Sequence, residues 1–210
     1  MSNTSKFATP QEEFWAGTFG VEYSRRSETK EILASNLNFF VRALDQISKI
    51  DSCLEFGANV GMNLRALRLL FPSMNISGIE INPEAAKQLI DFLGEKNVFA
   101  GSIFDYQVKE QVDLALIKGV LIHINPDMLA SVYEKLYQAS RKYILVCEYY
   151  NPVPVSIPYR GHENRLFKRD FAGEMLEKYP DLELLNYGFA YKRDKFHQDD
   201  ITWFLMKKRG

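Results

Sequence analysis

Residues 55–61 of the chain read Glu-Phe-Gly-Ala-Asn-Val-Gly and join a short apolar segment (residues 52–56) to a segment with helical spacing (residues 62–70). A glycine directly after a strand adopts a positive φ angle at little steric cost and lets a ligand approach the backbone. A second glycine at the start of the following helix permits close packing of helix and strand. The spacing therefore predicts a strand–turn–helix unit in which Gly57 forms the turn and Gly61 begins the helix.

The alternation of strand and helix continues along the chain. We expect helices over residues 28–47, 62–70, 83–93, 126–139 and 168–179, and strands over 52–56, 75–81, 97–100, 112–117, 143–148, 182–191 and 201–207. Such alternation predicts parallel strands, right-handed crossovers and helices on both faces of the sheet. The last two strands have no helix between them, so we expect them to pair antiparallel. The predicted fold class is α/β with one doubly wound sheet.

Two segments interrupt this alternation. Residues 1–28 are mostly polar but carry five large aromatic residues, Trp15 among them, and we expect an ordered arm that packs on the body. Residues 151–164 contain three prolines and a glycine, which exclude a helix or a central strand. We therefore expect a long loop there, and loops of that length in compact domains are commonly functional.

Composition narrows the classes of partner. The 210 residues include 26 Lys and Arg and 27 Asp and Glu, a formal net charge of -1 that supplies no general attraction to nucleic acid or anionic lipid. No apolar run approaches the roughly 18 residues of a membrane-spanning helix, and the amino-terminal residues lack the apolar core of a signal peptide. We expect a cytoplasmic protein with no nucleic-acid or membrane partner; a homodimer is left open.

Cysteine and histidine patterns give no sign of a metal site. Cys53 and Cys147 both lie in apolar strand segments and are expected to be buried thiols. The zinc-ligand patterns H-x-E, H-E-x-x-H and C-x-x-C do not occur in the sequence. The sequence therefore predicts no metal ligand.

Two acidic residues at strand ends indicate which nucleotide the turn would bind. Glu80 ends the second strand, nineteen residues after Gly61, where an acid can accept hydrogen bonds from the hydroxyls of a ribose. The glycine spacing is not G-x-G-x-x-G, and Glu55 puts a carboxylate where a pyrophosphate would lie, which disfavours a dinucleotide. A cationic adenosyl ligand without phosphate, such as S-adenosylmethionine, fits better. The alternative is a glycine turn in some other α/β protein.

The acid-x-Gly-x-x-x-Gly turn, Glu80 and the order of elements resemble class I S-adenosylmethionine-dependent methyltransferases over residues 30–208. The resemblance implies one Rossmann-like sheet of seven strands in the order 3-2-1-4-5-7-6, with a C-terminal antiparallel hairpin and an N-terminal aromatic arm. It implies that S-adenosylmethionine contacts Glu55, Gly57, Ala58, Asn59, Gly61, Glu80, Ile81, Ser102, Ile103, Lys118 and Trp15. Ser102 stands where the family often has an acid, and Asp105 is the alternative acid.

A closer resemblance extends over nearly the whole chain. The segments Phe-Trp-Ala-Gly-Thr-Phe-Gly (14–20), Glu-Phe-Gly-Ala-Asn-Val-Gly-Met-Asn (55–63), Glu-Tyr-Tyr-Asn-Pro (148–152), Tyr-Arg-Gly-His (159–162) and Phe-Lys-Arg-Asp-Phe (167–171) are similar to methyltransferases associated with pseudaminic acid biosynthesis. The cations Arg160, Lys168 and Arg169 beside the expected site suggest an anionic acceptor. We therefore expect a small polar, anionic acceptor such as an acidic sugar, a nucleotide sugar or an amino-acid-like metabolite.

Candidate residues for methyl transfer lie after the fourth and fifth strands. A hydroxyl or ammonium acceptor must lose a proton, for which His162 and His123 are the candidate bases. His123 could instead cap a turn, His162 could stabilise its loop, and we expect His197 to be a solvated hairpin residue. The candidate acceptor contacts are Tyr149, Tyr150, Asn151, Tyr159 and Arg160, the last because Arg pairs with carboxylates bidentately.

The predicted organisation is an arm or lid over residues 1–28 and a methyltransferase domain over residues 29–210. Two other functions stay open: a non-catalytic partner subunit that binds an adenosyl ligand, and a nucleic-acid methyltransferase. The acids Glu55 and Glu80 and the polar loop over residues 151–164 disfavour the non-catalytic subunit. The balanced charge and the lack of an Asn/Asp-Pro-Pro-Tyr-type motif after the fourth strand disfavour the second.

Overall fold

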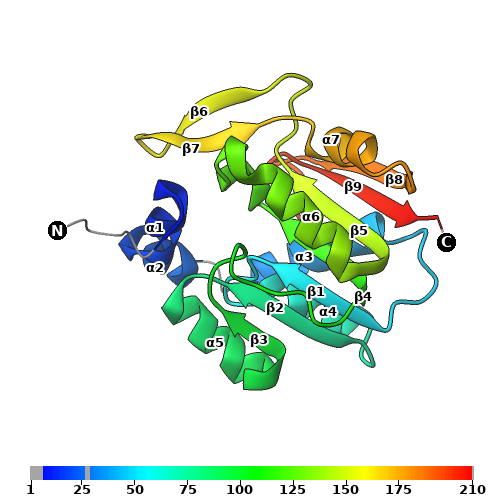
Figure 1. Ribbon diagram of the computed structural model, residues 1–210. Helices are drawn as coiled ribbons and strands as arrows, with labels where there is room; N and C mark the ends of the chain where they lie inside the picture. Colours follow the sequence, from blue (N-terminus) through cyan, green and yellow to red (C-terminus); the bar gives the residue numbers. More distant parts are fainter. Residues whose placement is uncertain (1–6, 27–28, 210) are drawn as a thin grey trace.

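A mixed sheet forms the centre of the molecule in the computed structural model, which describes residues 7–26 and 29–209 (Figure 1). Its strands are β1 (Ser52–Phe56), β2 (Asn75–Glu80), β3 (Val98–Ala100), β4 (Val112–Lys118), β5 (Ser140–Glu148), β8 (Leu182–Ala190) and β9 (Ile201–Lys208). Their order across the sheet is β3-β2-β1-β4-β5-β9-β8. The predicted order 3-2-1-4-5-7-6 is confirmed, because β8 and β9 are the sixth and seventh strands of this sheet.

Pairing within the sheet follows the connections between strands. The first five strands pair in parallel, and β9 runs antiparallel to both β5 and β8. The last four residues of β1 are fully covered, as expected for a central parallel strand with helices on both faces. Cys53 in β1 and Cys147 in β5 are both buried, as expected.

Helices cover the two faces of the sheet (Figure 1). The helices are α1 (Pro10–Ala16), α2 (Thr18–Arg25), α3 (Lys30–Ala43), α4 (Met62–Leu70), α5 (Pro83–Leu93), α6 (Leu129–Ala139) and α7 (Phe171–Lys178), with short 3₁₀ turns η1 (Glu95–Asn97), η2 (Leu121–His123) and η3 (Pro126–Met128). Apolar residues of α3, α4 and α5 form one core cluster with the sheet, and those of α6 and α7 form a second on its other face. Among residues 7–26 and 29–209, no helix has the length and apolar character needed to cross a bilayer.

Several helix boundaries differ from the prediction. The helix expected over residues 28–47 spans Lys30–Ala43, where the Thr29 side chain accepts a hydrogen bond from the Ile32 N–H. The helix expected from residue 168 begins at Phe171, because Asp170 caps it by accepting from the Gly173 N–H. The expected segment 126–139 is divided between η3 and α6.

The expectation of a long loop over residues 151–164 is wrong. Strands β6 (Val155–Tyr159) and β7 (His162–Lys168) form a separate two-stranded antiparallel sheet that stands away from the central one (Figure 1). Both strands of a two-stranded sheet are edges, so a proline there need not interrupt a ladder. Pro158 lies at the irregularity in register between Ile157 and Tyr159. The prolines exclude a central strand but not an edge hairpin.

The amino-terminal arm is ordered over its described residues 7–26 and forms α1 and α2. The Thr9 hydroxyl accepts from the Glu12 N–H, and the Glu12 carboxylate accepts from the Thr9 N–H, which makes a capping box at the start of α1. The Asn82 side-chain amide donates to the Trp15 carbonyl at 3.1 Å and so ties the arm to the turn between β2 and α5. The two ends of the predicted arm, residues 1–6 and 27–28, lie outside the described residues.

Candidate functional site

A cavity of about 530 Å³ lies at the carboxyl ends of β1, β2 and β4. Here the strand order reverses between β1 and β4, which is where doubly wound sheets bind ligands. We call it the switch-point cavity. The arm, α3, the tip of the β6–β7 hairpin and the loop between β8 and β9 also border it. Its volume is in the usual range for small-molecule sites.

Most of the residues predicted for the site line this cavity. They are Trp15, Gly57, Ala58, Asn59, Glu80, Ile81, Ser102, Ile103, Lys118, His123, Tyr149, Tyr159 and Arg160. The others lie outside its wall: Glu55, Gly61, Tyr150, Asn151 and His162. The exposed His197, predicted to be a solvated hairpin residue, also borders the cavity.

The turn after β1 needs glycine for two reasons. Gly57 has a φ of 75°, a conformation that other residues rarely adopt. A Cβ at this position would lie 2.5 Å from Cγ2 of Val120, so a side chain would clash as well as strain the backbone. Asn59 also has a positive φ, of 50°, in line with the tolerance of Asn for left-handed angles. The backbone of the turn therefore borders the cavity directly, and no side chain at Gly57 separates it from a ligand.

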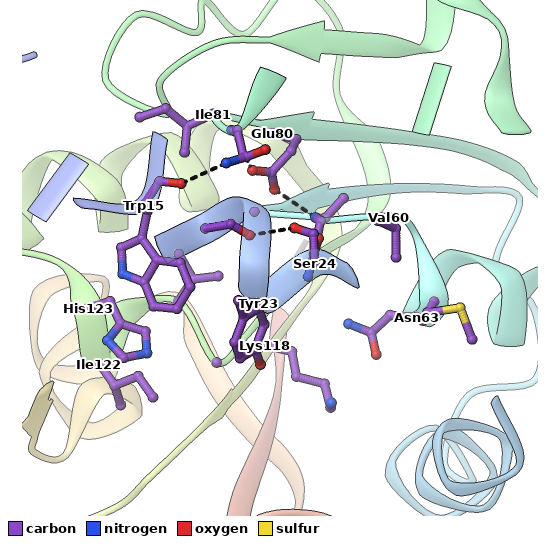
Figure 2. A pocket seen from close by; sticks show the side chains of 18 of the residues that line it. Trp15, Tyr23, Ser24, Val60, Asn63, Glu80, Ile81, Lys118, Ile122 and His123 are labelled. Carbon is purple, nitrogen blue, oxygen red and sulfur yellow. Dashed lines mark hydrogen bonds between the residues drawn. The ribbon is translucent and has the colours of Figure 1, made fainter. Parts of the chain in front are cut away.

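Glu80 presents a fixed carboxylate at the end of β2. Its Oε2 accepts from the Asn59 N–H at 2.7 Å and its Oε1 accepts from the Asn82 N–H, also at 2.7 Å. The side chain is buried, and burial raises its pKa although these N–H groups favour the ionised form. Figure 2 shows Glu80 on the cavity wall beside Ile81. Each carboxylate oxygen keeps a further lone pair for a ligand hydroxyl.

Glu55 is a buried acid behind the cavity wall. Its Oε1 accepts from Nδ2 of Asn63 at 2.6 Å, while Oε2 has no hydrogen-bond partner among the described residues. Burial raises the pKa of Glu55 to about 8, and nearby Lys118 acts in the opposite direction. Lys118 is itself in the cavity wall, and burial lowers its pKa. A buried, unsatisfied acid of this kind is a position where a cationic group of a ligand would be stabilised.

His123 is in the cavity wall, across the cavity from Glu80 and next to the indole of Trp15 (Figure 2). The centroid of its ring is 4.6 Å from that of Trp15 and 4.9 Å from that of Tyr159. Nδ1 lies 2.6 Å from the Arg165 carbonyl oxygen, which can only accept, so Nδ1 carries the proton and Nε2 remains an acceptor. Burial lowers the pKa of His123 to about 4, so the ring is neutral at pH 7.

Three of the predicted residues that lie outside the cavity wall contact other parts of the protein. His162 is exposed at the start of β7, with its ring 5.0 Å from that of Phe14. Tyr150 is exposed and lies 5.9 Å from the ring of Phe204. The Asn151 amide donates to the Val153 carbonyl at 2.6 Å. The structure therefore brings His123, and not His162, into the cavity wall.

Several residues of the cavity wall were not predicted from the sequence. Asn36 from α3 accepts a hydrogen bond from the Gln198 amide at 3.0 Å, and Asp199 follows in the same loop. Glu12 on the arm was also missed, although Thr9-Pro10-Gln11-Glu12 has the Thr-x-x-Glu spacing of a capping box. That signal locates a helix start but gives no sign that the acid faces a cavity. In the part of the chain that the structure describes, no three His, Cys, Asp or Glu side chains gather as a metal site would require.

Comparison with known proteins identifies the fold. No protein-family model matches the sequence. No curated protein is significantly similar to it. Solved structures of S-adenosylmethionine-dependent methyltransferases do share its architecture. Mitomycin 7-O-methyltransferase MmcR superposes with a TM-score of 0.68 and 13% identity over 96% of this chain, which spans 61% of that protein.

Two further structures are matched over most of their own length. The 1,6-didemethyltoxoflavin-N1-methyltransferase of Burkholderia thailandensis, solved with bound 1,6-didemethyltoxoflavin and S-adenosylhomocysteine, gives a TM-score of 0.70 and 12% identity, covering 95% of this chain and 87% of that one. Magnesium protoporphyrin IX methyltransferase ChlM of Synechocystis PCC 6803, with bound S-adenosylmethionine, gives 0.65 and 12%, covering 96% and 99%. At this identity the likeness shows that the chain has the Rossmann-like fold of class I methyltransferases.

Proposed function

We propose that this protein is an S-adenosylmethionine-dependent methyltransferase that acts on a small polar, anionic acceptor by in-line methyl transfer. The observation that carries the proposal is the buried Glu80 carboxylate, fixed by two backbone N–H groups, in the switch-point cavity beside the Gly57 turn. The shared fold supports it, and the finer assignment to an acidic sugar rests on the sequence resemblance.

The residues present fit S-adenosylmethionine. Glu80 has spare lone pairs for the two ribose hydroxyls, and the unsatisfied Oε2 of Glu55 suits the methionine ammonium near Lys118. Ile81 and Ile103 add apolar wall on the side of β2 and β3. When bound, the cofactor supplies a methyl group already activated by a sulfonium. The protein must then position an acceptor and exclude water.

Aromatic residues of the arm and hairpin would exclude that water. Trp15 lies 6.3 Å from Tyr159, ring centroid to ring centroid, and both border the cavity with Tyr149. Burial raises the pKa of Tyr149 and of Tyr159, so both rings stay neutral hydrogen-bond donors at pH 7. In this proposal residues 1–28 act as a lid, and the aromatic wall separates the acceptor from bulk solvent.

His123 is the proposed proton acceptor. Its Nε2 is unprotonated at neutral pH, and the Nδ1–H bond to the Arg165 carbonyl holds the ring in one tautomer and one orientation. A positioned base of this kind can take the proton from an acceptor hydroxyl or ammonium while the methyl group is transferred.

Binding of S-adenosylmethionine at pH 7 should release up to one proton. The pKa of Glu55, about 8 without a ligand, keeps this carboxyl largely protonated, and an ammonium placed beside it favours the ionised form. Calorimetry in buffers of different ionisation enthalpy measures the release, which should fade above pH 9 and disappear in Glu55→Gln. A wild-type enthalpy of binding that does not depend on the buffer at pH 7 would argue against this role.

Arg160 borders the cavity at the tip of the β6–β7 hairpin. Arg160 and Gly161 form the two-residue turn between the paired Tyr159 and His162, with φ angles of 49° and 85°. Turns with both angles positive favour Asn-Gly, so Arg160→Asn should keep or raise the melting temperature. If the cation binds an anionic acceptor, the same change should raise KM about tenfold or more with little effect on kcat.

Steady-state kinetics on the identified acceptor tests this role. Arg193→Asn is the matched control, because Arg193 is exposed in the β8–β9 loop and does not border the cavity. Cofactor affinity should stay unchanged in both variants. An unaltered KM in Arg160→Asn would remove the reason to expect an anionic acceptor.

A methyl-transfer assay tests the function as a whole. The purified protein is incubated with S-adenosylmethionine and panels of acidic sugars, nucleotide sugars and amino acids, and products are detected by mass spectrometry as a gain of one methyl group. Transfer to a member of these panels supports the proposal. Binding of the cofactor without transfer to any of them would favour a non-catalytic partner subunit.

A further inference from the structure

Glu12 is a buried acid on the arm that faces the switch-point cavity. It is 7% exposed, although the Glu of a capping box performs that task equally well in water. One carboxylate oxygen accepts from the Thr9 N–H at 3.0 Å, and the other accepts from the hydroxyl of Ser102, ninety positions away in the sequence. Both Glu12 and Ser102 border the cavity. The contact therefore joins the arm to the segment that follows β3.

The hydrogen-bond pattern leaves the Glu12 carboxylate and the Ser102 hydroxyl with acceptor positions only. The Ser102 hydroxyl gives its proton to Glu12, and its oxygen accepts from the Phe104 N–H at 3.0 Å. An ionised carboxylate has no proton to give, so the spare lone pairs of this pair can receive only a donor. A ligand group that binds here must carry an N–H or O–H.

The position of the pair relative to Glu80 indicates which ligand group reaches it. Glu80 ends β2, and Ser102 follows β3, the next strand outward in the sheet order. If Glu80 holds the ribose and the methionine part lies toward β4, the purine extends toward Ser102, between Ile81 and Ile103. The exocyclic amino group of adenine is the donor at that edge of the base.

We propose, on the basis of the methyltransferase function above, that Glu12 of the arm and Ser102 together recognise the 6-amino group of the cofactor's adenine. The acid that recognises the adenine, Glu12, is then part of the arm and not of the sheet. Closing of the arm and selection of an adenine over a 6-oxo purine become one event. A 6-oxo purine would place its carbonyl oxygen against the carboxylate, which costs binding energy.

The test compares two ligands in three proteins. Calorimetry measures the affinities of S-adenosylhomocysteine and of its 6-oxo analogue S-inosylhomocysteine for the wild type, Glu12→Gln and Glu13→Gln. Glutamine also serves in a capping box, so Glu12→Gln keeps α1 while it turns one acceptor into a donor. Glu13 is the exposed neighbour on the same helix and gives the matched control.

The wild type and Glu13→Gln should prefer the adenosyl ligand by about tenfold or more, and Glu12→Gln should lose most of that preference. If Glu12→Gln weakens both ligands by the same factor, Glu12 only holds the arm and the proposal is wrong. If Glu12→Gln binds neither ligand, the double variant Glu12→Gln/Ser102→Asp decides: a return of the adenosyl preference supports the proposal, and its absence contradicts it. Failure of the wild type to bind S-adenosylhomocysteine would instead contradict the proposed function.

Discussion

Glu80→Ala should reduce the affinity for S-adenosylhomocysteine by two orders of magnitude or more. Hydrogen bonds to a charged group contribute roughly 1.5–3 kcal/mol each, and the variant would lose two of them to the ribose. It would also leave the Asn59 and Asn82 N–H groups without the carboxylate that fixes the turn. Calorimetry with S-adenosylhomocysteine is the measurement, with thermal melting to show that the variant is folded.

Two further variants make this prediction specific. Glu95→Ala removes an exposed acid between α5 and β3 and should bind like the wild type. Gly57→Val should abolish binding by a different route, because it strains a φ of 75° and brings a side chain against Val120. Wild-type affinity in a folded Glu80→Ala protein would overturn the assignment of the cavity to an adenosyl cofactor.

His123→Ala should lower kcat by about 10²–10⁴-fold if the acceptor must lose a proton, since this is the usual contribution of a positioned base. Cofactor affinity should change little, because His123 lies across the cavity from Glu80 (Figure 2). Single-turnover kinetics on the identified acceptor separates the two effects. His162→Ala is the matched control: it removes an exposed imidazole near the same arm and should leave kcat close to that of the wild type.

The pH profile gives an independent check on His123. Because burial lowers its pKa to about 4, kcat/KM should lose activity only as the pH falls toward 4, with no ionisation of this group between pH 5 and 8. An acidic limb between pH 5 and 8 that is absent in His123→Ala would contradict this assignment.

Much of the architecture follows from local pattern. The alternation of apolar strand and amphipathic helix predicts the parallel part of the sheet, because crossover handedness leaves few other arrangements. The absence of a helix between β8 and β9 predicts their antiparallel pairing. Gly57 and Glu80 could be placed from sequence for the same reason: each stands at a strand end, and the carboxyl ends of parallel strands meet at one edge.

The β6–β7 hairpin shows where local pattern was insufficient. Prolines exclude a helix and a central strand, but whether a proline-containing segment pairs with a neighbour depends on which N–H groups the pairing needs. The turn at Arg160 and Gly161 contains one glycine where the common signal is Asn-Gly, so the hairpin was not recognised. Its placement then brought Tyr159 and Arg160 to the cavity and left His162 exposed.

The sequence alone determined the class of fold and the position of the glycine turn after β1, because these depend on periodicity and on residues a few positions apart; the strand order followed from the resemblance to class I methyltransferases. The choice between His123 and His162, and the contact between Glu12 and Ser102, depended on tertiary structure. In each case the partner is remote in sequence: Arg165 lies 42 positions from His123, and Ser102 lies 90 from Glu12. Burial and hydrogen bonding over such separations arise only when the arm, the sheet and the hairpin pack together, and no local pattern encodes them.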